Sequence, residues 1–414
     1  MWSSACKFPS HNRNRGRGSF VAVPAARLPV FLVRHSPICL ALWLTVWTCR
    51  AEPYLPKDAA QPLERLRATA FDPAQHQMRD LRAQLTREPT NAVLAEKFVR
   101  CCIDKYRTEA DPRYLGRAQA ALAPWWNQAA PPVELLVWRA TIKQSQHEFT
   151  ASLADLETAL RLAPRNGQAW LTRATVLTAL GDYAQARRAC APLAELAPGL
   201  LAVTAAANVT CLTGGAERGC ALLRRALEGN PSAGVSEKLW ALTLLAETSA
   251  RLGHDAEAEI YFKDALLLGQ RDPYLLGAYA DYLLQEGRAA EAVRLLRDEI
   301  RADGLLLRLA LAESAMTPRP STCGAHIAAL QARFEAGRMR GDFVHQREEA
   351  RFRLCLLHQP EEALRLAQAN WRVQRELADA RILIEAARAD GQPEAARPAL
   401  DFVKTNKIET VDLR

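Results

Sequence analysis

Apolar residues in this chain recur at spacings of three and four, in short segments separated by polar turns. The segment from Trp170 to Pro198 shows the pattern most clearly, because Trp170 is followed at fixed distances by Ala174, Leu177, Gly181, Tyr183, Ala186, Cys190 and Pro198. Such spacing is typical of amphipathic helices. No stretch shows the alternation of β-branched residues that a strand would need. The pattern predicts two antiparallel helices joined by a turn at Gly181.

The same unit recurs at a period close to 34 residues. If Trp170 is position 4 of a unit, four columns align. Position 8 is Ala140, Ala174, Ala207, Ala246 and Ala280; position 15 is His147, Gly181, Gly214, Gly253 and Gly287; position 20 is Ser152, Ala186, Gly219, Ala258 and Ala292; position 24 is Leu156, Cys190, Leu223, Phe262 and Leu296. The steps are 34, 33, 39 and 34 residues in each column. Columns that shift together indicate an internal repeat, and the 39-residue step predicts an insertion near residues 230–234.

Each column has a physical role in a helical hairpin. Small residues at positions 8 and 20 let two helices approach closely, and position 24 supplies bulk between them. Glycine at position 15 reaches positive φ without steric cost, which a tight turn between helices needs. Pro164, Pro198 and Pro231 fall between units, where a missing N–H ends one helix and can start the next. One hairpin cannot bury its apolar face alone, so stacked units are expected.

These columns resemble the tetratricopeptide repeat, a 34-residue helix–turn–helix unit. The resemblance implies an all-α, right-handed solenoid of helical pairs. Weaker pairs flank the five clear ones, at 93–104 with 115–122, 305–315 with 325–338, 343–357 with 360–371, and 378–389 with 393–403. We expect about eight pairs over residues 76–408, followed by a tail at 409–414.

The resemblance also implies a binding surface for a partner protein. In this family the first helices of the pairs line a concave groove, exposing positions 2, 5, 9, 12 and 13. Mapped onto this chain, the candidate groove residues are Thr141, Gln144, Thr175, Thr178, Asn208, Trp240, Glu247, Arg251, Tyr274, Asp281 and Gln285. Tyrosine and tryptophan are frequent binding anchors. The function expected is a non-catalytic scaffold that holds another protein.

The positive charge of the chain lies almost wholly at its N-terminus. Residues 1–51 contain seven basic residues and no acid, whereas the remaining 363 residues carry 47 basic and 46 acidic residues. An apolar run at 37–49 ends in Cys49-Arg50-Ala51, which predicts a secretory signal peptide cleaved after Ala51 and export to the periplasm. An uncleaved leader that anchors the protein at the inner membrane is the alternative.

The distribution of charged residues also restricts what the chain after residue 51 can bind. Residues 52–75 are expected to form a tether or capping segment. The near-neutral remainder lacks the surplus of bases that nucleic-acid binding requires, so no nucleic-acid partner is expected.

Motifs of catalysis are missing from the sequence. There is no G-x-S-x-G elbow, Walker loop or H-E-x-x-H, so we predict neither an enzyme nor a cofactor. Asp342, His345 and Glu349 are spaced to share one helix face and are candidate ligands of a divalent metal. The surrounding stretch contains many acidic and many basic residues, so a solvated helix start and a buried ion-pair network are the competing interpretations.

Two further alternatives remain open. The chain is a metal- or small-molecule-handling envelope protein if Asp342, His345 and Glu349 form a site. It is a self-associating assembly subunit if an end repeat binds a second copy. Cys211 and Cys220 lie on the two helices of one unit and are a candidate disulfide in an exported protein.

Overall fold

Helices are the only regular elements in the part of the chain that the structure describes, residues 73–342 and 344–411. The structure is a computed structural model, and these residues belong to one compact unit. The predictions for the leader at 1–51, for residues 52–72 and for residues 412–414 lie outside the described residues. None of the described helices combines the length and apolar character needed to cross a membrane.

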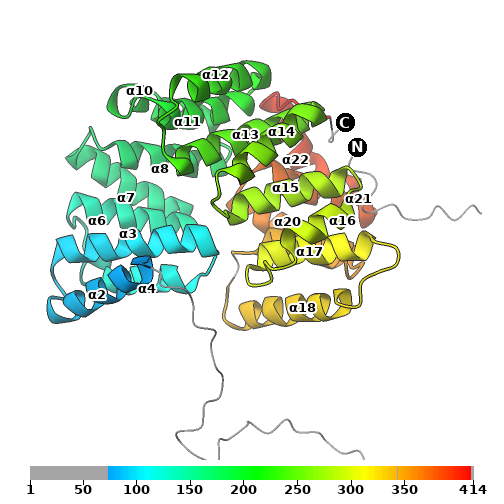
Figure 1. The fold of residues 1–414 in the computed structure, drawn as a ribbon, viewed down its shortest axis with the longest axis horizontal. Coiled ribbons are helices and arrows are strands. Elements are labelled where there is room, and N and C mark those ends of the chain that lie inside the picture. Colours follow the sequence, from blue (N-terminus) through cyan, green and yellow to red (C-terminus); the bar gives the residue numbers. More distant parts are fainter. Residues whose placement is uncertain (1–72, 343, 412–414) are drawn as a thin grey trace, which may run out of the picture. The chain divides into compact units, whose positions relative to one another are not determined.

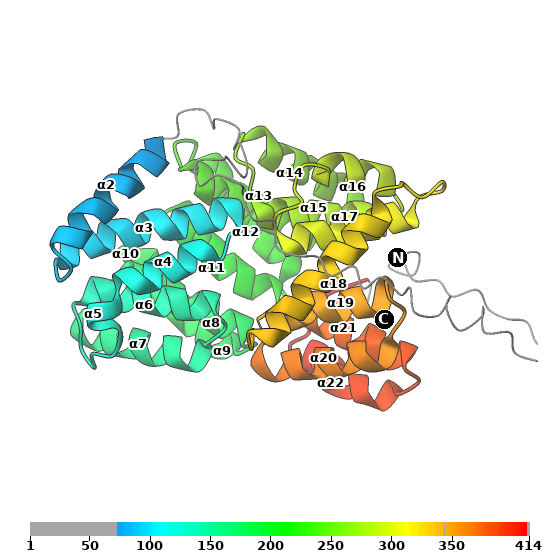
Figure 2. The ribbon, with the colours of Figure 1, turned by 90° about the horizontal axis from the view of Figure 1, so that it is seen from below.

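Nine antiparallel helical pairs follow one another along the described residues (Figures 1 and 2). The first helices are α3 (Ala92–Glu109), α6 (Val133–Ser145), α8 (Gly167–Ala179), α11 (Leu200–Cys211), α13 (Val235–Leu252), α15 (Pro273–Gln285), α17 (Asp303–Ala315), α19 (Gln346–Cys355) and α21 (Leu377–Ala389). The second helices are α4 (Arg113–Ala121), α7 (Phe149–Leu162), α9 (Tyr183–Cys190), α12 (Ala216–Gly229), α14 (Asp255–Leu267), α16 (Ala289–Leu296), α18 (Cys323–Met339), α20 (Pro360–Val373) and α22 (Arg397–Thr405).

The remaining elements extend this array. Helix α2 (Pro73–Arg87) precedes the first pair, and the short elements α5 (Ala123–Trp126), α10 (Leu193–Leu196) and η1 (Pro393–Ala396) adjoin second helices. The expected all-α solenoid of helical pairs is confirmed. Its nine pairs correspond to the five clear and four weaker pairs located in the sequence, although their number was expected to be about eight. Helix α2 begins inside the segment expected to be a tether.

The repeat columns have the geometry that their residue types predict. Gly181, Gly214, Gly253 and Gly287 have φ between 71° and 83°, and His147 adopts the same region at 58°. Ser152 at position 20 donates a hydrogen bond of 2.8 Å to the carbonyl of Ala140 at position 8. A Cβ at Gly219, which is position 20 of the next-but-one pair, would overlap the Cys211 sulfur. The close approach of α11 and α12 therefore requires glycine at this position. Small residues therefore set the distance between the two helices of a pair.

Three local expectations differ from the structure. The 39-residue step lengthens a helix rather than a loop, because α13 has 18 residues where α8 has 13. The turn of the first pair is short, since α3 continues to Glu109 and only three residues separate it from α4. Cys211 and Cys220 are both buried free thiols, so the candidate disulfide is not formed.

The last helical pair packs against the middle of the array. The amide of Arg375, just before α21, donates a hydrogen bond of 2.8 Å to the carbonyl of Ala179 at the end of α8. The ring of Phe402 in α22 lies 5.8 Å from that of Tyr183 in α9, measured between centroids. Ile408 is buried in the apolar cluster of α8, α9 and α11. The face that the sequence predicts to be an open groove is therefore partly covered by the chain itself.

Candidate functional site

A cavity of about 270 Å³ lies along α8, α11, α13 and α15, the first helices of four successive pairs. Seven of the eleven predicted groove residues line it: Thr178, Asn208, Glu247, Arg251, Tyr274, Asp281 and Gln285. The start of α21 supplies a wall that the sequence did not reveal, made of Glu376, Leu377, Ala378 and Arg381. The cavity is small for a ligand pocket, for which 300–1,000 Å³ is usual. What remains of the groove has room for a few side chains and not for a helix.

Four predicted groove residues lie elsewhere. Thr141 is buried and donates a hydrogen bond of 3.0 Å to the carbonyl of Val137 within its own helix. Trp240 packs against the apolar cluster of α8, α9 and α11. Gln144 on α6 is half-buried and Thr175 on α8 is exposed, but neither lines the cavity. The assignment of Thr141 to an exposed groove is wrong, because its side chain is buried, whereas Trp240 is partly buried against that cluster and does not line the cavity.

Glu247 and Tyr274 are hydrogen-bonded to each other in the cavity wall. The Tyr274 hydroxyl donates to both carboxylate oxygens of Glu247, at 2.9 and 3.1 Å, and Tyr274 is 64% exposed. No cation among the described residues lies within ion-pairing distance of Glu247. Burial raises the pKa of Glu247 to about 7, an effect that the Tyr274 hydrogen bond opposes. The cavity thus presents a carboxyl group whose charge changes near neutral pH.

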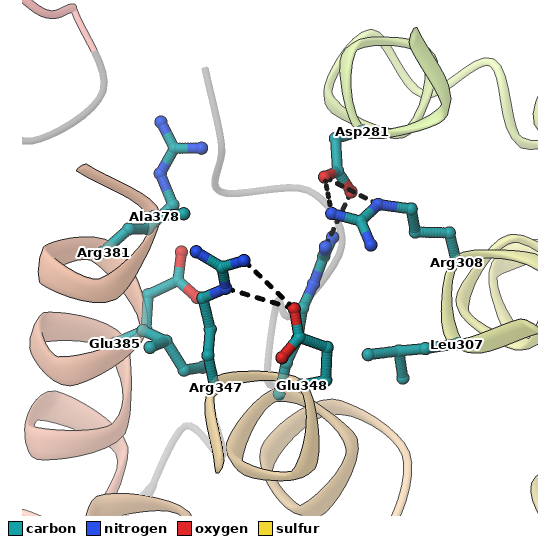
Figure 3. Close-up of a pocket in the computed structure, with 10 residues that line it drawn as sticks. Asp281, Leu307, Arg308, Arg347, Glu348, Ala378, Arg381 and Glu385 are labelled. Atoms are coloured by element: carbon teal, nitrogen blue, oxygen red, sulfur yellow. Dashed lines mark hydrogen bonds and ion pairs between the residues drawn. The ribbon is translucent and has the colours of Figure 1, made fainter. Parts of the chain in front are cut away.

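Asp281 joins three successive pairs through two arginines (Figure 3). Its Oδ2 accepts from Arg308 Nη2 at 2.6 Å and Nε at 2.9 Å, and its Oδ1 accepts from Arg351 Nη1 at 2.6 Å. These side chains come from α15, α17 and α19. Burial acts to raise the pKa of Asp281, but the two guanidinium groups outweigh it and hold the pKa at about 2. The carboxylate is therefore a fixed charge between repeats rather than a free ligand.

A second charged cluster fixes the start of α21. Arg347 contacts Glu348, Glu376 at 2.8 Å and Asp379 at 3.4 Å. Asp379 is fully buried and accepts hydrogen bonds from Asn370 Nδ2 at 2.8 Å and the Glu376 amide at 2.7 Å. Burial raises the pKa of Asp379 to about 6. Glu376 and Asp379 also form a capping box, which explains why the helix begins at this point.

The two charged clusters meet at a smaller cavity of about 60 Å³ (Figure 3). Its lining includes seven charged residues: Asp281, Arg308, Arg347, Glu348, Arg351, Arg381 and Glu385. Residues 340–351 stand out in the sequence because they contain many acidic and many basic residues. This density of charged residues identifies part of the cluster. The members on α21 carry no such signal, because they lie far from the rest along the chain.

The proposed metal face does not form. Helix α19 begins only at Gln346, so Asp342 and His345 precede it instead of sharing its face with Glu349. The Glu349 carboxylate is held by Arg338 and Arg353. The 80 Å³ cavity that these residues border is also lined by Arg333, Arg338, Arg340 and Arg365. Four guanidinium groups disfavour a cation, and no metal-binding group of His, Cys, Asp and Glu gathers among residues 73–342 and 344–411. Asp342 and His345 are exposed ahead of the helix, as the solvated helix start had it, and Glu349, Arg351 and Arg353 take part in ion pairs, as the ion-pair network had it.

The fold defines an all-α protein built of helix–turn–helix repeats, with repeat columns that resemble those of the tetratricopeptide repeat. No protein-family model matches the chain, and no curated protein sequence matches it significantly. Several solved structures are similar to it, but the superpositions are loose. The assignment therefore rests on the repeat columns and the helical pairs of the chain itself.

Three of these solved structures show the extent of the similarity. A tetratricopeptide repeat protein from Parabacteroides merdae is 17% identical, covers 70% of this chain and 98% of its own, and has a TM-score of 0.36. The Cut9–Hcn1 heterotetramer of APC/C is 13% identical over 78% of this chain and 62% of that one, with a TM-score of 0.47. Human IFIT1, solved as a dimer with m7Gppp-AAAA, is 14% identical over 82% and 95% of the two chains, with a TM-score of 0.37. At these values the similarity concerns the fold alone.

Proposed function

We propose that the chain is a non-catalytic scaffold that holds a partner protein at the cavity along α8, α11, α13 and α15. A single observation carries the proposal: the cavity wall holds a carboxyl group, Glu247, that accepts hydrogen bonds from a tyrosine hydroxyl and forms no ion pair with any of the described cations. A carboxylate surrounded by protein is costly to ionise unless a cation compensates it. The partner would supply that cation as a lysine or arginine side chain, which Tyr274 would also contact through its ring.

The size of the cavity limits the form of the partner. A helix about 10 Å across would not fit a space of about 270 Å³, whereas a loop or an extended segment places single side chains in it. The proposed partner therefore presents a basic residue on a loop or an extended segment. The alternative of a metal-handling protein based on Asp342, His345 and Glu349 is set aside for the reasons given above.

Photo-crosslinking in the host cells tests the proposal. A photoreactive amino acid at Gln285, which lines the cavity outside the ion-pair clusters, should capture one stoichiometric partner. Glu247→Gln should reduce that adduct at least fivefold, and the adduct should also weaken between pH 8 and pH 6 in lysates, because Glu247 becomes protonated and loses its charge. Glu257→Gln, the same change at an exposed glutamate of α14, is the matched control. An adduct that Glu247→Gln leaves intact would show that the partner does not bind at this cavity.

We further propose that the scaffold acts outside the cytoplasm, as its basic leader and the apolar run at 37–49 suggest. N-terminal sequencing of the protein recovered from the periplasmic fraction should then begin at Glu52. Recovery in the cytoplasmic fraction with the leader intact would contradict export. Recovery in the membrane fraction with the leader intact would favour the anchored form.

A further inference from the structure

The segment that follows α22 lies along a row of turns in the middle of the array. We name residues 406–411 the tail, and the turns at Gly181, Gly214 and Gly253 the turn row. A Cβ at Gly214 would stand 3.1 Å from Cβ of Lys407, and one at Gly253 would stand 3.5 Å from Cγ1 of Val411. At Gly181 a Cβ would meet Phe402 of α22 at 2.6 Å. The turns at Gly214 and Gly253 thus contact the tail at the same position of their hairpins, and the turn at Gly181 contacts α22 just before the tail.

The tail is held through its backbone and one carboxylate. Arg251 Nη1 donates to the carbonyl of Glu409 at 2.7 Å, and the amide of Val411 donates to the carbonyl of Arg251 at 3.1 Å. The Glu409 carboxylate accepts from the amide of Ala216, the first residue of α12, at 2.7 Å. A helix N-terminus favours an anion at this place. Hydrogen bonds to the carbonyl of Glu409 and from the amide of Val411, with a carboxylate at a helix end, are recognition features that do not depend on covalent linkage.

Arg251 is itself held in place for this contact. Its Nη2 donates to the carbonyl of Cys211 at 2.8 Å, and the residue is 8% exposed. The guanidinium is therefore oriented by α11 while it serves the tail. Ile408 supplies the apolar part, since it is 6% exposed and lies in the cluster with Tyr183 and Val209.

We propose that the turn row, with Arg251 and the start of α12, is a second binding surface for an extended segment of the partner protein, and that the tail occupies it in cis. The segment that fits has the pattern of residues 408–411: a branched apolar residue, a glutamate, a threonine and a second branched apolar residue. The proposal deepens the proposed function, because it adds a second recognition element next to the cavity that Arg251 also lines.

The tail competes with a partner segment for the turn row, and it has the advantage of being joined to the same chain. A segment joined by a short linker competes at an effective concentration in the millimolar range. A free peptide at micromolar concentration is therefore excluded from the turn row while the tail is bound. Releasing the tail should raise the apparent affinity for such a peptide, because a larger fraction of the protein becomes competent to bind.

Fluorescence anisotropy with a labelled peptide tests this. The probe is a fluorescein-labelled peptide with the sequence of residues 404–411, Lys-Thr-Asn-Lys-Ile-Glu-Thr-Val. The full-length chain carrying Ile408→Asp should bind it at least tenfold more tightly than the unchanged chain, since a carboxylate in the apolar cluster expels the tail. A peptide with glutamine in place of its glutamate should bind the Ile408→Asp chain at least threefold more weakly. Equal binding of the two peptides, or no gain from Ile408→Asp in a folded chain, would overturn the proposal.

A second variant covers the case in which Ile408→Asp unfolds. Glu409→Gln with Val411→Asp removes contacts of the tail outside the apolar cluster, and circular dichroism reports whether the helices persist. This variant should also bind the probe more tightly, and a folded variant without that gain again overturns the proposal. Sedimentation of the unchanged chain adds one more outcome: a dimer that disappears in this variant would assign the turn row to a second copy, against the proposal. The crosslink from Gln285 is independent of these results, so failure here leaves the cavity proposal standing.

Discussion

Replacing Asp281 by alanine is expected to lower the free energy of unfolding by about 3 kcal/mol, because two partly buried guanidinium groups lose their common anion. Arg308 and Arg351 have side chains that are 20% and 18% exposed, so water compensates them only in part. Chemical denaturation at pH 7 measures the loss. Glu257→Ala breaks an exposed ion pair between neighbouring pairs and should cost less than about 1 kcal/mol.

The same variant has a defined pH dependence. The pKa of Asp281 is about 2 in the folded chain and about 3.9 in an unfolded one, so its stabilising effect is complete above pH 4 and is lost as the pH falls towards 2. The difference in stability between the unchanged chain and Asp281→Ala should therefore shrink as the pH falls from 4 towards 2. A difference that stays constant over this range would show that Asp281 acts through packing rather than charge.

Asp155→Ala should have the largest effect, a loss of about 4 kcal/mol. Arg139 Nη2 and Nε donate to the Asp155 carboxylate at 2.7 and 2.9 Å, and Lys143 Nζ approaches it at 2.8 Å. The side chains of Arg139 and Asp155 are only 6% and 9% exposed. Removal of the carboxylate leaves two cations, one of them deeply buried, without an anion between α6 and α7.

The effect of Asp155→Ala would also reach the preceding element, because Arg139 Nη1 donates to carbonyls at the end of α5, those of Trp125, Trp126 and Gln128. Thermal denaturation followed by circular dichroism measures the loss. Glu195→Ala is the matched control, because Glu195 forms an exposed ion pair with Arg165 at 2.9 Å. Its loss should change the unfolding free energy by less than about 1 kcal/mol. A similar cost for the two variants would contradict the assignment of Asp155 as a buried anchor.

The pairing of helices follows from the sequence because it depends on local columns. Gly181 and its equivalents have one conformational role, and Ala140 and Ser152 one steric role, so their spacing identifies a hairpin without knowledge of its neighbours. The 39-residue step was detected for the same reason. Its location in α13 was not, because a longer helix and a longer loop shift the columns equally.

The candidate site was predictable only where it depends on one hairpin at a time. Glu247, Tyr274 and Asp281 occupy repeat positions that expose a side chain, and they do line the cavity. Glu376 and Arg381 line it as well, but they reach it by the packing of α21 on helices that end more than 90 residues earlier in the chain. The spacing of Asp342, His345 and Glu349 predicts a shared helix face, and this prediction is wrong because α19 begins after the first two residues. Charge pairs between distant segments, such as Arg351 with Asp281, leave no periodic trace.

The contact of the tail with the turn row has a consequence for how the array is made. Repeat arrays are stabilised mainly by nearest neighbours, so each hairpin can fold as soon as the next one is present. Here Arg251 and Ala216 find hydrogen-bond partners in Glu409, 158 and 193 residues further along the chain. The central hairpins therefore remain incompletely covered during synthesis until the last helical pair has been added. Completion of the fold depends on an event at the far end of the chain, which makes the array a closed cooperative unit rather than a sum of repeats.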